Sequence, residues 1–380
     1  MSGPILPGAT IGILGGGQLG RMTAMAARSL GYHLFTLDPD PSCAARFVVE
    51  RCFTAQLDDA AAAAELARGC EVVTLEIEKV SLAALDAVAQ HAPMRPGSQV
   101  LGIVQDRARQ KAWLKRHGFP LGPYSDAKDA TELAAAVTAL GGACFAKATQ
   151  GGYDGKGQVV IREAAAAAAA WDELGKAPMV VEKALDLEAE ISVMVARRPS
   201  GQVAIYPAAL NHHENRILAW SVLPAPLPEK LARTAAELAR AIAEAIDVQG
   251  LLAVEMFLTR QGELLVNELA PRPHNSFHAT EVGCATSQFE QAVRAICDLP
   301  LGAPDVLRPA AICNLLGDLW LEHPRPAFDA ALALPGVRLH LYGKRVARPG
   351  RKMGHLSAIG ATPDEAVARV QAAYRAIGGH

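Results

Sequence analysis

The stretch from Lys147 to Gln158 constrains this chain more than any other, because it packs four glycines and two lysines together. Glycine allows positive φ and a close approach of backbone to ligand, and successive N–H groups in such a turn form a concave anion site. Apolar, strand-like segments at 144–146 and 159–161 flank the stretch. We therefore predict a β-hairpin whose tip grasps a phosphate. The alternative is a flexible surface hairpin.

This motif differs from a P-loop. A P-loop needs G-x-x-x-x-G-K followed by Ser or Thr and a helix, whereas Gly157 follows Lys156 here and a strand-like segment comes next. Lys147 and Lys156 supply the flexible point charges that suit a phosphate.

Composition and charge exclude several classes of protein. The chain has 380 residues, 51% of them hydrophobic, and a net charge of −2, so we expect two or three globular domains and no nucleic-acid partner. Its seven cysteines are scattered without a C-x-x-C pair, which favours reduced thiols over disulfides or zinc. Apolar runs of about 18 residues and a signal-like start are both lacking. We therefore expect a cytoplasmic protein with no membrane partner.

The N-terminal residues predict the opening of a doubly wound α/β sheet. Strands at 10–14 and 33–37 enclose a G-x-G-x-x-G pattern at 15–20, and Asp38 follows the second strand. Taken alone, this pattern is that of an NAD or FAD site, so an NAD-dependent oxidoreductase is one alternative function. A tight strand–helix turn, or a helix N-terminus that binds another phosphate, explains the glycines equally well.

Another strand, at 70–75, ends in Glu76 and Glu78. Ligands gather at the carboxyl ends of strands in open α/β sheets, so both acids are candidates for substrate contacts. A solvated strand end would also explain Glu78.

The middle of the chain predicts a second unit. We place a domain boundary at 100–106 and a helix over 105–117. Helices at 129–140 and 163–174 surround the glycine-rich hairpin, and a buried strand then ends near Leu185, where its backbone and side chain suit an adenine.

A histidine pair follows in the same unit. We expect residues 211–213 (Asn-His-His) in a loop between strands at 203–209 and 217–222. Since no third ligand lies at a useful spacing, we expect no zinc site there.

Two apolar strands, 250–258 and 263–268, are joined by a turn and carry Glu255 and Glu268. Two buried carboxylates are costly unless a cation neutralises them, and Mg²⁺ prefers carboxylate oxygens together with substrate phosphates. We therefore predict a magnesium site. Acids on separate exposed faces are the alternative.

Basic and polar side chains follow this site. Arg272, His274 and Asn275 project from a proline-fixed loop, which suggests an anionic substrate. Near the C-terminus, residues 348–352 hold three cations. They predict a site for a phosphate monoester, or else a solvated turn.

Four motifs together resemble the ATP-grasp superfamily and, within it, the 5-(carboxyamino)imidazole ribonucleotide synthetase family. They are Gly-Gly-Gly-Gln-Leu-Gly-Arg-Met at 15–22, Gly-Gly-Tyr-Asp-Gly-Lys-Gly-Gln at 151–158, Asn-Glu-Leu-Ala-Pro-Arg-Pro-His-Asn-Ser at 267–276 and Gly-Arg-Lys-Met-Gly-His at 350–355. The resemblance covers essentially the whole chain. It implies an α/β (α+β) ATP-grasp fold with a Rossmann-like parallel-sheet domain at 1–104, an ATP-grasp domain at 105–300 and a small C-terminal domain at 301–380.

The resemblance also implies a reaction. The family converts ATP, bicarbonate and 5-aminoimidazole ribonucleotide into the carboxyamino product, ADP and phosphate, in purine synthesis, with Mg²⁺ as cofactor and as a homodimer. Another ATP-grasp ligase and a non-catalytic nucleotide-binding protein are the alternatives.

Carried over residue by residue, the family's contacts fall on many positions. Those to ATP fall on Arg107, Lys147, Gly152, Tyr153, Asp154, Gly155, Lys156, Gly157, Gln158, Glu182, Lys183, Ala184, Leu185, Glu190, His213, Asn267 and Glu268. Those to the ribonucleotide fall on Gln18, Leu19, Glu76, Tyr153, Asp154, Arg272, His274, Asn275, Lys344, Arg351 and Lys352. The magnesium ligands are Glu255 and Glu268, and the catalytic residues are Tyr153, Asp154, Lys156 and Arg272. We expect Asp154 to help remove the amine proton and Arg272 to hold the anionic carboxyl intermediate.

The chain departs from the family at three positions. Phe277 and Arg216 stand where the family usually has glycine, and Ala279 stands where it has an aromatic residue. We expect Phe277, next to His274 and Asn275, to reshape the substrate pocket.

Overall fold

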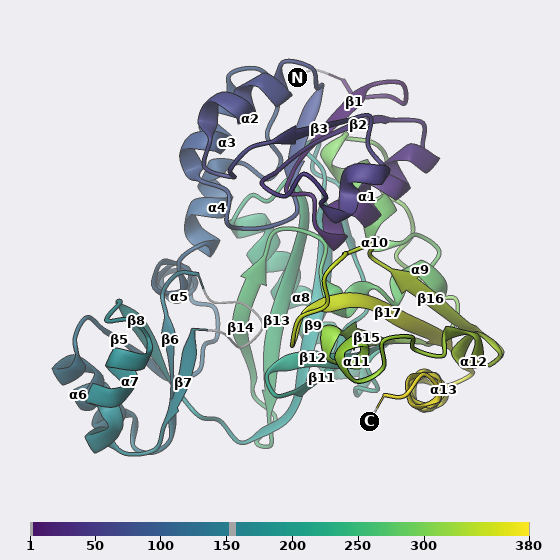
Figure 1. The fold of residues 1–380 in the computed structure, drawn as a ribbon. Coiled ribbons are helices and arrows are strands. Elements are labelled where there is room, and N and C mark those ends of the chain that lie inside the picture. Colours follow the sequence, from purple (N-terminus) through teal and green to yellow (C-terminus); the bar gives the residue numbers. More distant parts are fainter. Residues whose placement is uncertain (1–2, 152–156, 380) are drawn as a thin grey trace.

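The computed structural model describes residues 3–151 and 157–379, which form three sheets with helices packed on them (Figure 1). The candidate residues Gly152 to Lys156 therefore lie outside the described residues. Within the described part of the chain, every helix is too short or too polar to cross a membrane.

The N-terminal sheet is parallel, as the sequence predicted. Its strands lie in the order β3 (Arg51–Thr54), β2 (His33–Asp38), β1 (Thr10–Leu14) and β4 (Val72–Leu75). Around it lie α1 (Gln18–Ser29), the short η1 (Ala44–Phe47), α2 (Ala60–Ala67), α3 (Leu82–Ala89) and α4 (Ser98–Val104). β1 and β4 are buried almost throughout, which explains their continuous apolar sequences.

Helix α5 (Arg107–Arg116) leads into a small lobe, at the lower left of Figure 1. The lobe has four antiparallel strands in the order β5 (Tyr124–Ala127), β8 (Met179–Lys183), β6 (Cys144–Ala148) and β7 (Gln158–Ile161). Against them pack α6 (Ala130–Leu140), η2 (Ala164–Ala166) and α7 (Ala167–Glu173), which complete a separate hydrophobic core. The predicted hairpin is confirmed, because β6 pairs with β7 and Lys147 stands opposite Gln158.

The central sheet has nine strands. Eight lie in the order β14 (Leu264–Ala270), β13 (Gly250–Thr259), β9 (Leu187–Arg197), β11 (Ala209–Glu214), β12 (Ile217–Leu223), β15 (Ala310–Leu316), β17 (Lys352–Ile359) and β16 (Val337–Leu341), and β10 (Val203–Ile205) pairs with β9. The helices of this part are α8 (Glu229–Ala245), η3 (Asn275–Phe277), α9 (Thr280–Gly283), α10 (Gln288–Ile296), α11 (Gly317–Glu322), α12 (Phe328–Leu332) and α13 (Pro363–Ala376). The C-terminal strands thus continue the sheet that the middle of the chain begins, and the mixed α/β class is confirmed.

Two local predictions were wrong. The histidine pair lies in β11 rather than in a loop, and the hairpin turns at Asn215 and Arg216, which both have positive φ. Phe277 does not reshape the cavity described below, because its ring is fully buried and packs edge-on against Tyr206. In the short helix η3 this apolar side chain faces the core.

Candidate active site

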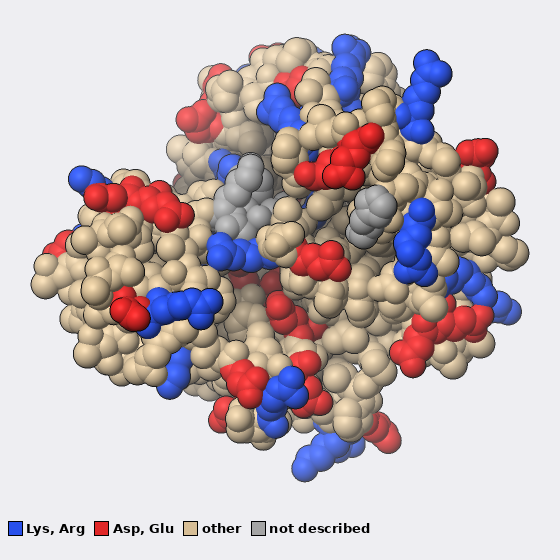
Figure 2. All heavy atoms as spheres, turned by 60° about the horizontal axis from the view of Figure 1, so that its bottom comes forward, with Lys and Arg blue, Asp and Glu red and all other residues tan. Residues whose placement is uncertain are grey.

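A cavity of about 1440 Å³ is lined by residues from the N-terminal part, the lobe and the central sheet. Figure 2 shows the molecule hollowed beside the lobe, with acidic side chains inside the hollow. Among the described residues, every nucleotide, metal and substrate candidate lines this cavity except Gly157 and Ala184. These two instead use their backbones to pair with Ala148 and Ala143.

One wall of the cavity holds a carboxylate between two lysines. Glu182, in β8, lies 2.8 Å from the ammonium of Lys147 and 3.1 Å from that of Lys111. Burial raises the pKa of Glu182, but the two lysines outweigh it and lower the pKa below its usual value. Burial lowers the pKa of Lys111 more than Glu182 raises it. Sequence reasoning missed Lys111, which is 4% exposed, because it sits among exposed basic residues of α5.

The two carboxylates of β13 and β14 face each other. The register sets Glu255 opposite Glu268, and both line the cavity, as their spacing around the turn indicated. Burial raises the pKa of Glu268; Arg107, at 3.6 Å, opposes that rise and Glu255 adds to it. Burial acts on Glu255 in the same direction and is the largest single influence, but the hydrogen bond and charge of His274, together with the charges of His213 and Arg272, outweigh it and lower the pKa of Glu255 to about 2.

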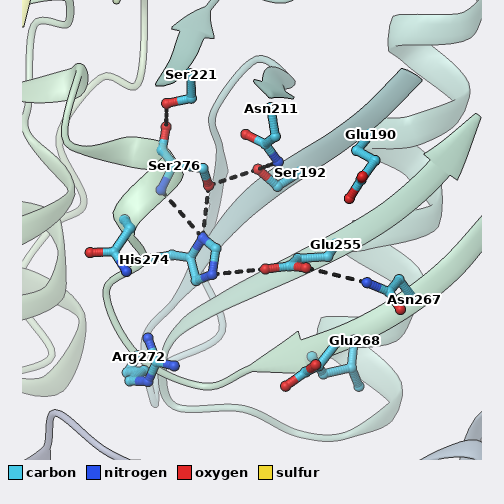
Figure 3. Close-up of polar contacts among 12 residues, drawn as sticks. Glu190, Ser192, Asn211, Ser221, Glu255, Asn267, Glu268, Arg272, His274 and Ser276 are labelled. Carbon is cyan, nitrogen blue, oxygen red and sulfur yellow. Dashed lines mark hydrogen bonds and ion pairs between the residues drawn. The ribbon is translucent and has the colours of Figure 1, made fainter. Parts of the chain in front are cut away.

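A hydrogen-bond network behind Glu255 fixes the orientation of His274 (Figure 3). Nε2 of His274 lies 2.9 Å from Glu255, and its Nδ1 lies 2.7 Å from Oγ of Ser276. The Ser276 hydroxyl is also 2.8 Å from Oγ of Ser192, which accepts a hydrogen bond from Asn211 at 3.1 Å. Three strands and the loop after β14 therefore hold one imidazole.

Sequence reasoning did not single out Ser192 or Ser276, although both are fully buried. The one available signal is a small polar residue inside an apolar strand, as at Ser192 between Ile191 and Val193. Such a residue needs a buried hydrogen-bond partner.

Arg272 is held by Glu78, the acid whose role the sequence left open. Nε of Arg272 lies 2.7 Å from Oε1 of Glu78. Burial lowers the pKa of Arg272, but Glu78 outweighs it and raises the pKa above its usual value. Glu78 is thus no solvated strand end, since it orients a charged guanidinium in the cavity.

Carboxylates of the chain itself close the glycine loop after β1. Glu76 accepts hydrogen bonds from the amides of Gly17 and Gly20 at 2.6 and 2.8 Å, and Asp38 accepts one from Gly16 at 2.7 Å. In a dinucleotide site such amides bind the pyrophosphate. The NAD and FAD interpretation is therefore wrong, and so is that of another phosphate bound there, because carboxylates already occupy these donors.

Lys344 joins distant parts of the substrate candidates. Its ammonium donates to Oε1 of Gln18 at 2.5 Å and to the carbonyl of Lys352 at 2.7 Å. The Gln18 amide donates in turn to Oδ1 of Asn275 at 3.4 Å. Lys352 is only 6% exposed, and the cationic segment 348–352 lines the cavity. These observations favour the predicted binding site over a solvated turn, although Arg348 is exposed.

His213 and Glu190 form another polar pair in the cavity. Nδ1 of His213 lies 3.2 Å from the carboxylate of Glu190, across β11 and β9. Burial lowers the pKa of His213, but the contact with Glu190 and the charges of Glu190 and Glu255 together outweigh it and raise the pKa.

Three family profiles match consecutive parts of the chain. A ribonucleotide synthetase preATP-grasp domain matches residues 8–105, an ATP-grasp domain matches residues 112–289, and a phosphoribosylaminoimidazole carboxylase C-terminal domain matches residues 310–369.

Full-length relatives and solved structures resemble the chain as well. The N5-carboxyaminoimidazole ribonucleotide synthase of Bacillus subtilis is 42% identical, over 95% of this chain and 94% of the relative, and that of Brucella melitensis is 43% identical, over 93% and 97%. A structure of an N5-carboxyaminoimidazole ribonucleotide synthetase with ADP matches with a TM-score of 0.92 and 40% identity, over 98% of both chains. A synthase from Aspergillus clavatus, in complex with ADP and 5-aminoimidazole ribonucleotide, matches with a TM-score of 0.89 and 31% identity, over 97% and 98%.

Proposed function

The chain belongs to the N5-carboxyaminoimidazole ribonucleotide synthase family, and we propose that it carboxylates 5-aminoimidazole ribonucleotide with bicarbonate and ATP, in purine synthesis. One observation carries this proposal. A single cavity unites Lys147 of the glycine-rich hairpin, the Glu255–Glu268 pair and the loop of Arg272.

The nucleotide belongs on the side of the cavity that the lobe forms. Lys147 suits its phosphates, and the end of β8 with Leu185 suits the adenine. The mutual contacts of Lys147, Glu182 and Lys111 would keep the first lysine in place before ATP arrives.

Magnesium fits the carboxylate pair. Glu255 and Glu268 are paired across β13 and β14 and are partly buried, and desolvation together with the charge of Glu255 raises the pKa of Glu268. A divalent cation with oxygen preference would relieve that repulsion. When bound, Mg²⁺ would neutralise charge on the phosphates during phosphoryl transfer.

The reaction we propose has two steps. Bicarbonate oxygen bonds to the γ-phosphorus while the bond to ADP breaks, which forms carboxyphosphate. The amine of the ribonucleotide then bonds to its carboxyl carbon, or to CO₂ released from it, as phosphate leaves and the amine loses a proton. Arg272, oriented by Glu78 at 2.7 Å, would hold the anionic carboxyl group.

Other roles rest on the family resemblance. We propose Asp154 as acceptor of the amine proton, with Tyr153 and Lys156 beside it, although these three lie outside the described residues. We also propose that Arg351 and Lys352 bind the ribonucleotide phosphate and that Lys344 contributes to binding the ribonucleotide. The domain boundaries predicted above, a homodimer and a cytoplasmic location remain part of this proposal.

Release of ADP tests the function directly. With Mg²⁺, ATP and bicarbonate present, we expect strong stimulation by 5-aminoimidazole ribonucleotide. ATP turnover that ignores the ribonucleotide would overturn the proposed substrate.

A second experiment tests the role of Arg272. Replacing Arg272 by Lys keeps the charge but loses the planar fork, so kcat/KM for the ribonucleotide should fall by about 100-fold while KM for ATP stays unchanged. Arg260→Lys is the control, since Arg260 pairs with Asp186 at the surface. An unchanged kcat/KM in Arg272→Lys would remove this residue from the mechanism.

A further inference from the structure

Three metal-type ligands meet outside the cavity, between α9 and the C-terminal strands β16 and β17. Oε2 of Glu281 lies 3.8 Å from Nε2 of His355 and 4.0 Å from Nδ1 of His340. The three ligand atoms all lie within 4.8 Å of one another. None of these three side chains lines the active-site cavity.

The spacing of these atoms suits an ion better than direct contacts. Separations of 3.8 and 4.0 Å exceed hydrogen-bond length. Two ligands that each lie about 2.1 Å from a tetrahedral ion are about 3.4 Å apart. Glu281 and His340 keep 31% and 20% of their side chains exposed, so solvent can reach the three atoms from their side.

A neighbouring hydroxyl orients His355 for such a role. Its Nδ1 lies 2.8 Å from the hydroxyl of the fully buried Tyr342. Metal-bound histidines commonly use their second ring nitrogen in this way, which fixes the ring and directs the other nitrogen to the ion.

We propose that Glu281, His340 and His355 bind a divalent metal ion of the zinc class, with water completing the coordination. Two imidazoles and one carboxylate are donors that zinc favours, whereas magnesium prefers oxygen ligands alone. The site is therefore chemically distinct from the Glu255–Glu268 pair.

The bound ion would stiffen a wall of the ribonucleotide site. His278 stacks on His355 with ring centroids 4.7 Å apart, and Nε2 of His278 lies 3.1 Å from Oδ1 of Asn275. An ion that ties α9 to β16 and β17 would restrain His355 and, through this stack, the substrate candidate Asn275.

Zinc binding to the full-length protein tests the proposal. Equilibrium dialysis with Zn²⁺ is carried out with saturating Mg²⁺ and ADP, which shield the polar pairs of the cavity. The variants are Glu281→Gln and His340→Asn, whose side chains are partly exposed. His212→Asn is the matched control, because His212 is exposed and lies 3.4 Å from Glu214.

Wild type and the control should bind one zinc ion more than either variant. Zinc bound by the seven cysteines does not affect this difference, because all four proteins carry the same cysteines. Zinc should also raise the unfolding temperature of wild type and control but not that of the variants. Tyr342→Phe, which keeps the ring but loses the hydroxyl, should weaken zinc binding by about tenfold. Equal zinc stoichiometry and affinity in wild type, Glu281→Gln and His340→Asn would overturn the site.

Discussion

Glu182 is the residue on which the nucleotide side of the cavity depends electrostatically. It neutralises Lys147 and Lys111 at 2.8 and 3.1 Å, and its side chain is only 12% exposed. A buried charge that loses its partner remains desolvated without compensation. The loss of Glu182 should therefore affect stability as well as ATP binding.

We predict that Glu182→Gln lowers the free energy of unfolding by about 3 kcal/mol, because it strands the buried Lys111. Denaturant unfolding at pH 7 measures the change. The control is Glu237→Gln, which breaks an exposed pair with Arg233 at 4.0 Å and should change stability very little. Equal effects of the two substitutions would contradict the buried-pair argument.

The same residue predicts a pH dependence. The pKa of Glu182 is lowered in the folded protein from an ordinary value of 4.5. Its stabilising contribution is therefore complete above pH 4.5 and is lost as pH falls through the lower, folded pKa. The stability difference between wild type and Glu182→Gln should shrink when unfolding is measured at decreasing pH below 4.5. A difference that stays constant down to acid unfolding would rule out this titration.

At the scale of elements, the turn from β1 into α1 is determined by Glu76. The carboxylate binds the amides at the start of the helix, and a Cβ on Gly17 would approach Glu76 Oε1 to 2.4 Å. These contacts help to fix the start of α1 at Gln18. The glycines therefore let the Glu76 carboxylate approach the backbone closely, and their amides bind this carboxylate rather than a nucleotide.

Gly17→Ala should consequently destabilise the protein by about 2 kcal/mol, since Glu76 must move and lose charge-assisted hydrogen bonds. Thermal or denaturant unfolding measures it. Gly102→Ala is the matched control: it lies within α4, its new Cβ would meet Leu82 at an ordinary 3.5 Å, and a gain of up to about 1 kcal/mol is expected. A neutral Gly17→Ala would show that Glu76 does not need its observed position.

The hairpin of β13 and β14 shows how far local pattern can predict. Residues alternate across a strand, and the turn at Gly262 sets the count on each side. This count predicts the two strands and their pairing, but by itself it would set Glu255 opposite Asn267. An irregularity between Glu255 and Met256 shifts the register by one residue and brings Glu255 opposite Glu268. The histidine pair in β11 was misplaced because polar side chains that border a cavity give a strand the composition of a loop.

At the scale of the whole molecule, the lobe is an independently packed unit. The hydrophobic core between its sheet and α6 and α7 contains residues of the lobe alone, whereas another core is shared by the N-terminal part and the central sheet. Elements that share few buried contacts with the remainder open at lower free energy. The lobe also carries one wall of the cavity.

We predict that backbone amides of β5, β6 and β8 exchange hydrogen together and sooner than those of β9 and β13. Addition of Mg²⁺ and a non-hydrolysable ATP analogue should slow exchange in the lobe, because the nucleotide joins it to the central sheet. Hydrogen exchange followed by mass spectrometry measures both effects. Uniform protection of lobe and central sheet, with or without nucleotide, would contradict independent opening.

The sequence by itself determined the local elements and the kinds of chemistry: a glycine-rich hairpin with lysines, two adjacent strands that each carry a carboxylate, and a rigid loop with Arg272 and His274. These depend on backbone conformation and side-chain alternation over a few residues. Only the tertiary structure decided the partners. Arg272 with Glu78, Lys344 with Gln18 and Glu281 with His355 are joined across long stretches of chain. The physical reason is that a long-range contact depends on packing and desolvation in the folded interior, which no local periodicity specifies.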